Sequence, residues 1–154
     1  MHIVHVLGVI LWIGGLAFIT ILVIPATIKN PNALEKVLQF QRIEHKFAPI
    51  ARVYNLIVLI SGFYMFFSLG LEEVIFTSSG VPLLFMTVVG IFWFIMLFGL
   101  EPLIIKKVLD RMAKKPEEMN IDSIFAVMNK LHWVLLTISL LASGAGVIVA
   151  HGYF

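Results

Sequence analysis

Cysteine is absent from the 154-residue sequence, and charged residues make up only 13% of it. The missing cysteine excludes structural disulfides and thiolate metal sites. The scarcity of charge excludes a water-soluble globular domain, in which roughly 25% of residues are charged. Hydrophobic residues make up 60% of the chain, and they lie in runs of about twenty, the length that crosses the hydrocarbon core of a bilayer. We therefore expect a multi-pass membrane protein with little room for a separate soluble module.

Four apolar segments are predicted to span the lipid bilayer, and together they form a single domain over residues 1–154. Backbone polar groups in lipid must be paired within the protein, and four spans are too few for a closed barrel, so each span is a helix. The predicted fold class is an all-α, integral membrane four-helix bundle. The spans are expected at residues 2–24, 47–71, 81–105 and 131–150.

Two of the three connections between spans carry further structural signals. Residues 34–44 have an apolar residue every three or four positions, which predicts a short interfacial helix in the first connection. The third connection is interrupted at Lys115-Pro116. After this break, Asp122 or Ser123 is expected to cap a helix that continues into the fourth span.

All eleven basic residues lie on the side of the membrane that the first and third connections share. By the positive-inside rule this side faces the cytoplasm, so both termini and the Glu72-Glu73 turn lie on the non-cytoplasmic side. We expect the inner (cytoplasmic) membrane as the location. Lipid headgroups account for the basic residues, so nucleic acid is excluded as a partner, and a homo-oligomer is a further expectation. The basic residues are Lys29, Lys36, Arg42, Lys46, Arg52, Lys106, Lys107, Arg111, Lys114, Lys115 and Lys130.

Each predicted span carries one stripe of polar or small residues at helical spacing, and we expect the four stripes to face the bundle interior because polar groups are costly in lipid. Pro49 is expected in the first turn of the second span, where proline is tolerated. The methionines within spans, Met86 among them, are expected to fill packing space. The stripes are His5, Gly8, Trp12 and Gly15; His45, Ala48, Arg52, Asn55, Leu59 and Gly62; Met86, Gly90, Trp93, Leu97 and Glu101; His132, Ser139, Ser143 and Gly146.

The five histidines gather at the two edges of the predicted bundle. His45 and His132 begin spans at the cytoplasmic edge, whereas His2, His5 and His151 lie at the outer edge. Histidine is a common metal ligand, and four-helix bundles hold cofactors between facing helices. The pattern favours haem b held by His5 with His151, and a second haem held by His45 with His132. Histidine also lies at membrane interfaces without binding a ligand. For each of the five histidines, this alternative interpretation stays open.

Arg52 and Glu101 are the only formal charges well inside the predicted spans. Their similar depth predicts an ion pair, with Asn55 and Tyr54 supplying further hydrogen bonds. In the alternative, Arg52 binds a carboxylate of a ligand, such as a haem propionate, and Glu101 handles protons. Together with Trp12, which shares the stripe of His5, Arg52 and Asn55 complete the expected cofactor-binding set.

Two motifs resemble a known family. The first runs from His5 through Trp12-Ile13-Gly14-Gly15 to Pro25, and the second is Phe47-Ala48-Pro49-Ile50-Ala51-Arg52, followed by Ser61-Gly62. They resemble the copper-resistance D-type (CopD-like) membrane domain superfamily, which is related to bacterial membrane haem-binding protoporphyrinogen oxidases. The resemblance covers residues 1–65 and implies a copper or haem site that includes His5.

These features favour a membrane b-type haem protein that carries electrons through one or two histidine-ligated haems. Two histidine ligands leave no open position on the iron, which favours electron transfer over a catalytic oxidoreductase. The oxidase group carries a lysine and a histidine together inside a later span, and this chain does not. Copper transport or delivery, with copper as the cofactor, and a protoporphyrinogen oxidase-like reaction remain the alternatives. The redox partner is expected in the membrane or the periplasm.

Overall fold

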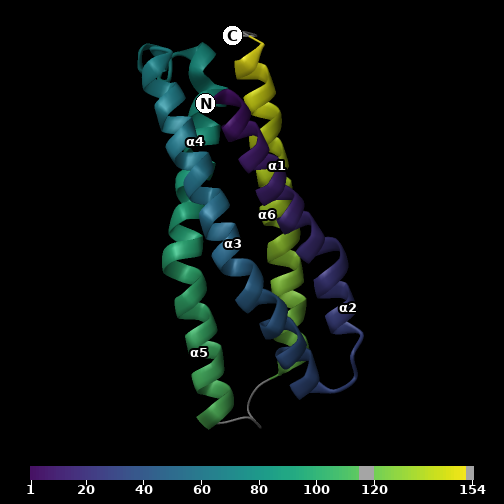
Figure 1. The fold of residues 1–154 in the computed structure, drawn as a ribbon. Helices are drawn as coiled ribbons and strands as arrows, with labels where there is room; N and C mark the ends of the chain where they lie inside the picture. The colour runs from purple at the N-terminus through teal and green to yellow at the C-terminus, as the bar shows by residue number, and fades with distance from the viewer. Residues whose placement is uncertain (115–119, 152–154) are drawn as a thin grey trace.

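The computed structural model describes residues 1–114 and 120–151, apart from the side chains of residues 109 and 112–114. The predicted break at Lys115-Pro116 lies outside these residues. The described residues form helices and short turns, with no strand among them. Four of the helices are long and apolar enough to cross a membrane, which confirms the predicted all-α four-helix bundle (Figure 1). They are His2–Ile28, Ala33–Ser68, Ser78–Val108 and Ile121–Ala150.

Apolar side chains cover the outside of the bundle. Ile3, Ile60 and Leu103, on three different helices, are 75%, 66% and 65% exposed. A surface of this kind is stable in lipid and would aggregate in water. The chain is therefore a multi-pass membrane protein.

The first span is a rod of three helical pieces, and it extends beyond its predicted end at residue 24. The pieces are α1 (His2–Phe18), the π-helical turn η1 (Ile19–Val23) and α2 (Ile24–Ile28). Pro25 explains the π turn, because proline has no N–H to donate and its ring clashes with the carbonyl four residues earlier. The N–H of Ile24 instead bonds to the carbonyl of Ile19, five residues back.

The second span is longer than predicted, because α3 (Ala33–Ser68) has 36 residues. Residues 34–44, expected as a short helix of the first connection, are helical but continue into the span without a break. Asn32 caps α3 by accepting two backbone N–H groups with its side chain. Pro49 consequently lies in the helix interior and not in its first turn. The carbonyl of His45 therefore lacks its usual N–H partner.

The third span, like the first, consists of two α-helices joined by a π-helical turn. A turn containing the short 3-10 helices η2 (Leu71–Glu73) and η3 (Ser78–Gly80) leads into α4 (Val81–Ile95), η4 (Met96–Leu100) and α5 (Glu101–Lys114). The turn η4 is again π-helical and is followed by a proline, Pro102. The two rods thus adapt to proline in the same way.

The fourth span is α6 (Ile121–Ala150), which starts before the predicted span at residue 131. Asn120 caps it by accepting the N–H of Ser123 at 2.9 Å. The predicted caps, Asp122 and Ser123, were wrong because the helix already begins at Ile121. Near this start, Lys36 of α3 is buried and forms an ion pair with Asp122.

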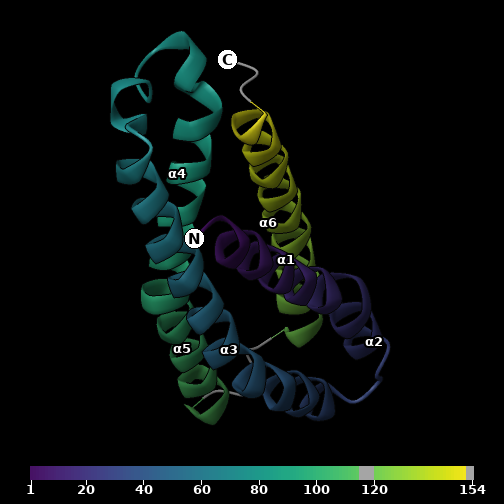
Figure 2. The ribbon, with the colours of Figure 1, turned by 45° about the horizontal axis from the view of Figure 1, so that its top comes forward.

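The four rods form a ring in which α1 and α4 each pack against both α3 and α6. The largest contacts are α1 with α3 and α4 with α6, so the bundle consists of two helical hairpins. Figure 1 shows the beginning of α1, the α3–α4 turn and the end of α6 at one end of the molecule, here named the terminal end, and Figure 2 shows the turn and the end of α6 there again. The buried core between the hairpins contains Trp12, Leu16, Ala51, Val89, Trp93, Leu97 and Leu136.

Candidate functional site

Two buried tryptophans meet in the centre of the bundle from diagonally opposite helices. The ring centroids of Trp12 on α1 and Trp93 on α4 are 5.1 Å apart, and the rings are nearly perpendicular at 85°. This edge-to-face geometry is favourable for aromatic pairs. The indole N–H of Trp93 also donates to Oγ of Ser139 on α6 at 2.9 Å. These contacts fix the relative height of α1, α4 and α6 and define a tryptophan layer.

His5 lies seven residues before Trp12 on α1, toward the terminal end. Its Nδ1–H donates to the carbonyl oxygen of Val58 at 3.0 Å, and Oγ of Ser61 lies 3.1 Å from the same nitrogen. The Ser61 hydroxyl donates to the carbonyl of Ile57, so it accepts from His5. A carbonyl oxygen only accepts, so Nδ1 carries a proton, and in the neutral ring the lone pair is then on Nε2.

Gly62 provides the space that the ring of His5 occupies. A Cβ atom at position 62 would lie 3.1 Å from Cε1 of His5, which is closer than ordinary van der Waals contact. The close packing of α1 against α3 at this level therefore depends on a residue without a side chain. His5 is partly buried there, against α3.

The predicted ion pair between Arg52 and Glu101 is confirmed, with 3.4 Å between Nη2 and Oε2. The Nε–H of Arg52 also donates to the carbonyl of Leu97 at 2.9 Å. In η4 the N–H of Glu101 bonds to the carbonyl of Met96, and the next residue, Pro102, has no N–H to offer Leu97. Arg52 therefore supplies the donor that the π turn cannot, which gives this charge a structural reason to lie inside a span.

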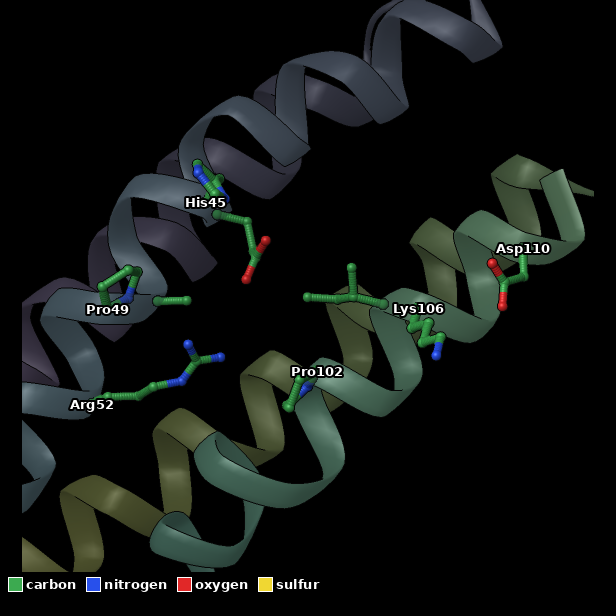
Figure 3. A pocket seen from close by; sticks show the side chains of 9 residues that line it. His45, Pro49, Arg52, Pro102, Lys106 and Asp110 are labelled. Atoms are coloured by element: carbon green, nitrogen blue, oxygen red, sulfur yellow. The ribbon is translucent and has the colours of Figure 1, made fainter. Parts of the chain in front are cut away.

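A pocket of about 390 Å³ lies beside this ion pair, between α3 and α5. Figure 3 shows His45 and Arg52 on α3, and Pro102, Lys106 and Asp110 on α5. The pocket combines side chains of both charges with an apolar wall of proline, alanine and isoleucine. Its lining residues are Glu44, His45, Ala48, Pro49, Arg52, Pro102, Ile105, Lys106 and Asp110. His132 is not among them, so the pocket does not bring the predicted inner histidine pair together.

His132 and His151, both on the last rod, are held by their own helix. Nδ1 of His132 donates to the carbonyl of Met128, and Nδ1 of His151 to the carbonyl of Val147, each at 2.9 Å. His132 is partly buried, whereas His151 is exposed.

The heights of His5 and His151 differ along the bundle. His151 is twelve residues beyond Ser139 of the tryptophan layer, which corresponds to about 18 Å of helix rise, whereas His5 is about 10 Å from Trp12. Ligation of one haem by His5 with His151, or by His45 with His132, stays a prediction.

Asn55 differs from its predicted role. It is fully buried, and neither its Nδ2 nor its Oδ1 has a hydrogen-bond partner. It therefore does not support the Arg52–Glu101 pair, although it lies one turn from Arg52 on α3. A buried amide without partners is costly, and such a group indicates a place where a further polar atom is accommodated. Trp12 is a core residue in contact with Trp93, and its place beside a cofactor stays a prediction.

Sequence reasoning missed the partners that hold these residues. Ser61 entered only as part of a family motif, and nothing in the sequence pairs it with His5, because that contact depends on the register between α1 and α3. The acceptor for Arg52, the carbonyl of Leu97, is a backbone atom and leaves no sequence signal of its own. Pro102, which follows η4, was the one sequence feature that could have indicated a carbonyl without its usual backbone partner.

Among the described residues, no three His, Asp or Glu side chains gather into a group that would hold a metal ion. Comparison of the chain with protein-family models, characterised proteins and solved structures finds no match. The geometry around His5 is therefore the strongest basis for assigning a function.

Proposed function

We propose that the chain is a b-type haem protein that carries electrons in the cytoplasmic membrane, with His5 as an axial ligand of the haem iron. The observation that supports this is the 3.0 Å hydrogen bond from Nδ1 of His5 to the carbonyl of Val58. Metal-ligating histidines commonly donate their second ring nitrogen to such an acceptor, which orients the ring and fixes the tautomer. An ionisable residue inside an apolar span is itself a candidate for function.

The surroundings of His5 suit a haem better than an isolated metal ion. A haem iron needs only one or two protein ligands because the porphyrin supplies the other nitrogens, and no larger ligand group is present among the described side chains. Asn55, fully buried with an unpartnered amide, is seven residues before Gly62 on α3 and is the nearest candidate for a further polar contact from this helix. When bound, the haem supplies a reversible one-electron couple. Val58 and Ser61 hold the ligating ring, and the tryptophan layer closes the site on its inner side.

The remaining parts of the proposal come from the distribution of polar residues. The basic residues support a topology with both termini, and hence His5, on the outer side of the membrane. A redox partner in the membrane or periplasm would then exchange electrons at this end. A second haem at His45 is supported by the pocket there, where Arg52 and Lys106 suit propionate groups; His132 as its second ligand rests on the sequence pattern alone. The motifs around His5 and Arg52 support membership of the copper-resistance D-type superfamily.

The test is a visible spectrum of the purified protein in detergent, before and after addition of haem b. We expect a Soret band and, after reduction, an α band. His5→Ala should remove the haem of the outer site, whereas His45→Ala tests the inner site separately. A protein without these bands even after haem addition, or a His5→Ala variant with an unchanged spectrum, would overturn the proposal. Copper retained in place of haem would favour the copper-delivery alternative.

A further inference from the structure

The two helical hairpins carry similar residues at matching heights beside the tryptophan layer. Trp12 and Trp93 are 81 positions apart, and so are His5 and Met86. His5 packs against Gly62 of α3, and Met86 packs against the equivalent glycine of α6, Gly146. A Cβ atom at Gly146 would lie 3.5 Å from Sδ of Met86. Met86 thus occupies the position between α4 and α6 that His5 occupies between α1 and α3.

Helix geometry places His5 and Met86 at one height in the bundle. Each lies seven residues from its tryptophan toward the terminal end, about 10 Å along the helix. Seven residues are nearly two full turns, so each side chain leaves its helix on the same face as its tryptophan. Because Trp12 and Trp93 meet across the bundle, His5 and Met86 lie on the inward faces of opposite helices.

The other two helices present glycines at this height. Gly62 is in contact distance of His5, and Gly146 is seven residues beyond Ser139, the Trp93 partner. The layer therefore contains two side chains that can ligate a metal and two residues with no side chain. The two glycines let the ring of His5 lie against α3 and the thioether of Met86 lie against α6, so each candidate ligand is held beside the other helix of its own hairpin.

We infer that Met86 is the second axial ligand of the haem whose first ligand is His5, an inference that rests on the proposed haem function. The thioether sulfur of methionine is a soft, neutral ligand, and histidine–methionine ligation raises the reduction potential of a haem relative to two histidines. His151, the partner expected from the sequence, is about 8 Å further along the bundle than this layer. Methionine and histidine together fill both axial positions, which suits electron transfer.

The test compares three variants of the full-length protein loaded with haem b. Met86→Leu should abolish the near-infrared sulfur-to-iron charge-transfer band of the oxidised protein. Met86→His should retain haem but shift the midpoint potential to a more negative value. Met96→Leu is the matched control, because Met96 packs against the core on the same rod, and it should leave both the band and the potential unchanged.

The outcomes separate the two levels of the proposal. Absence of haem from the wild-type protein after haem addition would overturn the haem function itself. Haem bound by the wild-type protein, with a band and potential that Met86→Leu does not alter, would overturn the role of Met86 alone. Loss of the band in His151→Ala and not in Met86→Leu would contradict it equally, whereas loss confined to the Met86 variants supports it.

Discussion

The two helical hairpins of this bundle share a scaffold and differ in chemistry. Both begin with a rod that carries a tryptophan, a π turn and a proline, and both close the layer above the tryptophans with a glycine. The first hairpin adds a histidine with two hydrogen-bond partners, an arginine and a buried asparagine, whereas the second has methionine, leucine and serine at the corresponding places. Tryptophan, proline and glycine therefore set the geometry, while different residues at equivalent positions supply the candidate reactive groups.

The hairpins also differ in where the π turn lies. In the first rod η1 begins seven residues after Trp12, and in the third rod η4 begins three residues after Trp93. The offset of one turn brings the carbonyl of Leu97 within reach of Arg52. The position of Arg52 in the ion pair therefore depends on η4 as well as on the attraction between Arg52 and Glu101.

The largest expected effect on stability comes from replacing the charge pair with apolar residues, as at the equivalent position of the first rod. Ile24 precedes Pro25 as Glu101 precedes Pro102, and it is fully buried. Glu101→Ile should destabilise the protein by about 3 kcal/mol, because it leaves Arg52 unpaired inside a span. Adding Arg52→Leu should recover most of that loss in thermal unfolding measured in detergent. A double variant as unstable as Glu101→Ile would contradict the idea that the pair is interchangeable with apolar residues.

A smaller effect should distinguish the two glycines of the ligand layer. Gly62→Ala forces the ring of His5 to move, because the new Cβ would lie 3.1 Å from it, whereas the Cβ of Gly146→Ala makes an ordinary contact at 3.5 Å. We expect roughly tenfold weaker haem binding for Gly62→Ala, a loss typical of disturbed groups around a metal ligand. Gly146→Ala should bind haem nearly as the wild type does. Equal affinities in a haem titration would show that the His5 ring is not tightly held.

The smallest effect concerns the tryptophans. Trp93→Phe removes the hydrogen bond to Ser139 together with the indole area, and we expect it to cost about 1 kcal/mol more than Trp12→Phe. The two free energies of unfolding can be compared in the same detergent. Ser139→Ala, which removes only the acceptor, is the control and should account for the difference.

Much of the fold could be predicted from the sequence, because apolar runs and the lengths that lipid imposes determine four helices. The positions of the helix ends were less predictable. Residues 34–44 continue into α3 because nothing between them and the span breaks a helix, and Asn32 provides the cap at the start. Pro49 did not mark a boundary because a long helix tolerates the loss of one hydrogen bond when its neighbours hold it in place.

The candidate site was predictable in part. The Arg52–Glu101 pair followed from the depth of two charges, since an unpaired charge in a span is costly. The proposed role of Met86 could not be predicted from the sequence, because a methionine in an apolar helix is usually a packing residue. Its meaning depends on the contact between Trp12 and Trp93, a long-range feature that sets the height of one hairpin against the other.

X-ray absorption at the iron edge, recorded on the haem-loaded wild-type protein, reports which atoms bind the iron. A haem held between His5 and Met86 predicts one sulfur neighbour of the iron in addition to the nitrogens of the porphyrin and of histidine. The same measurement on Met86→Leu should show no sulfur. An iron surrounded by nitrogen alone in the wild-type protein, or no iron retained at all, would contradict the account.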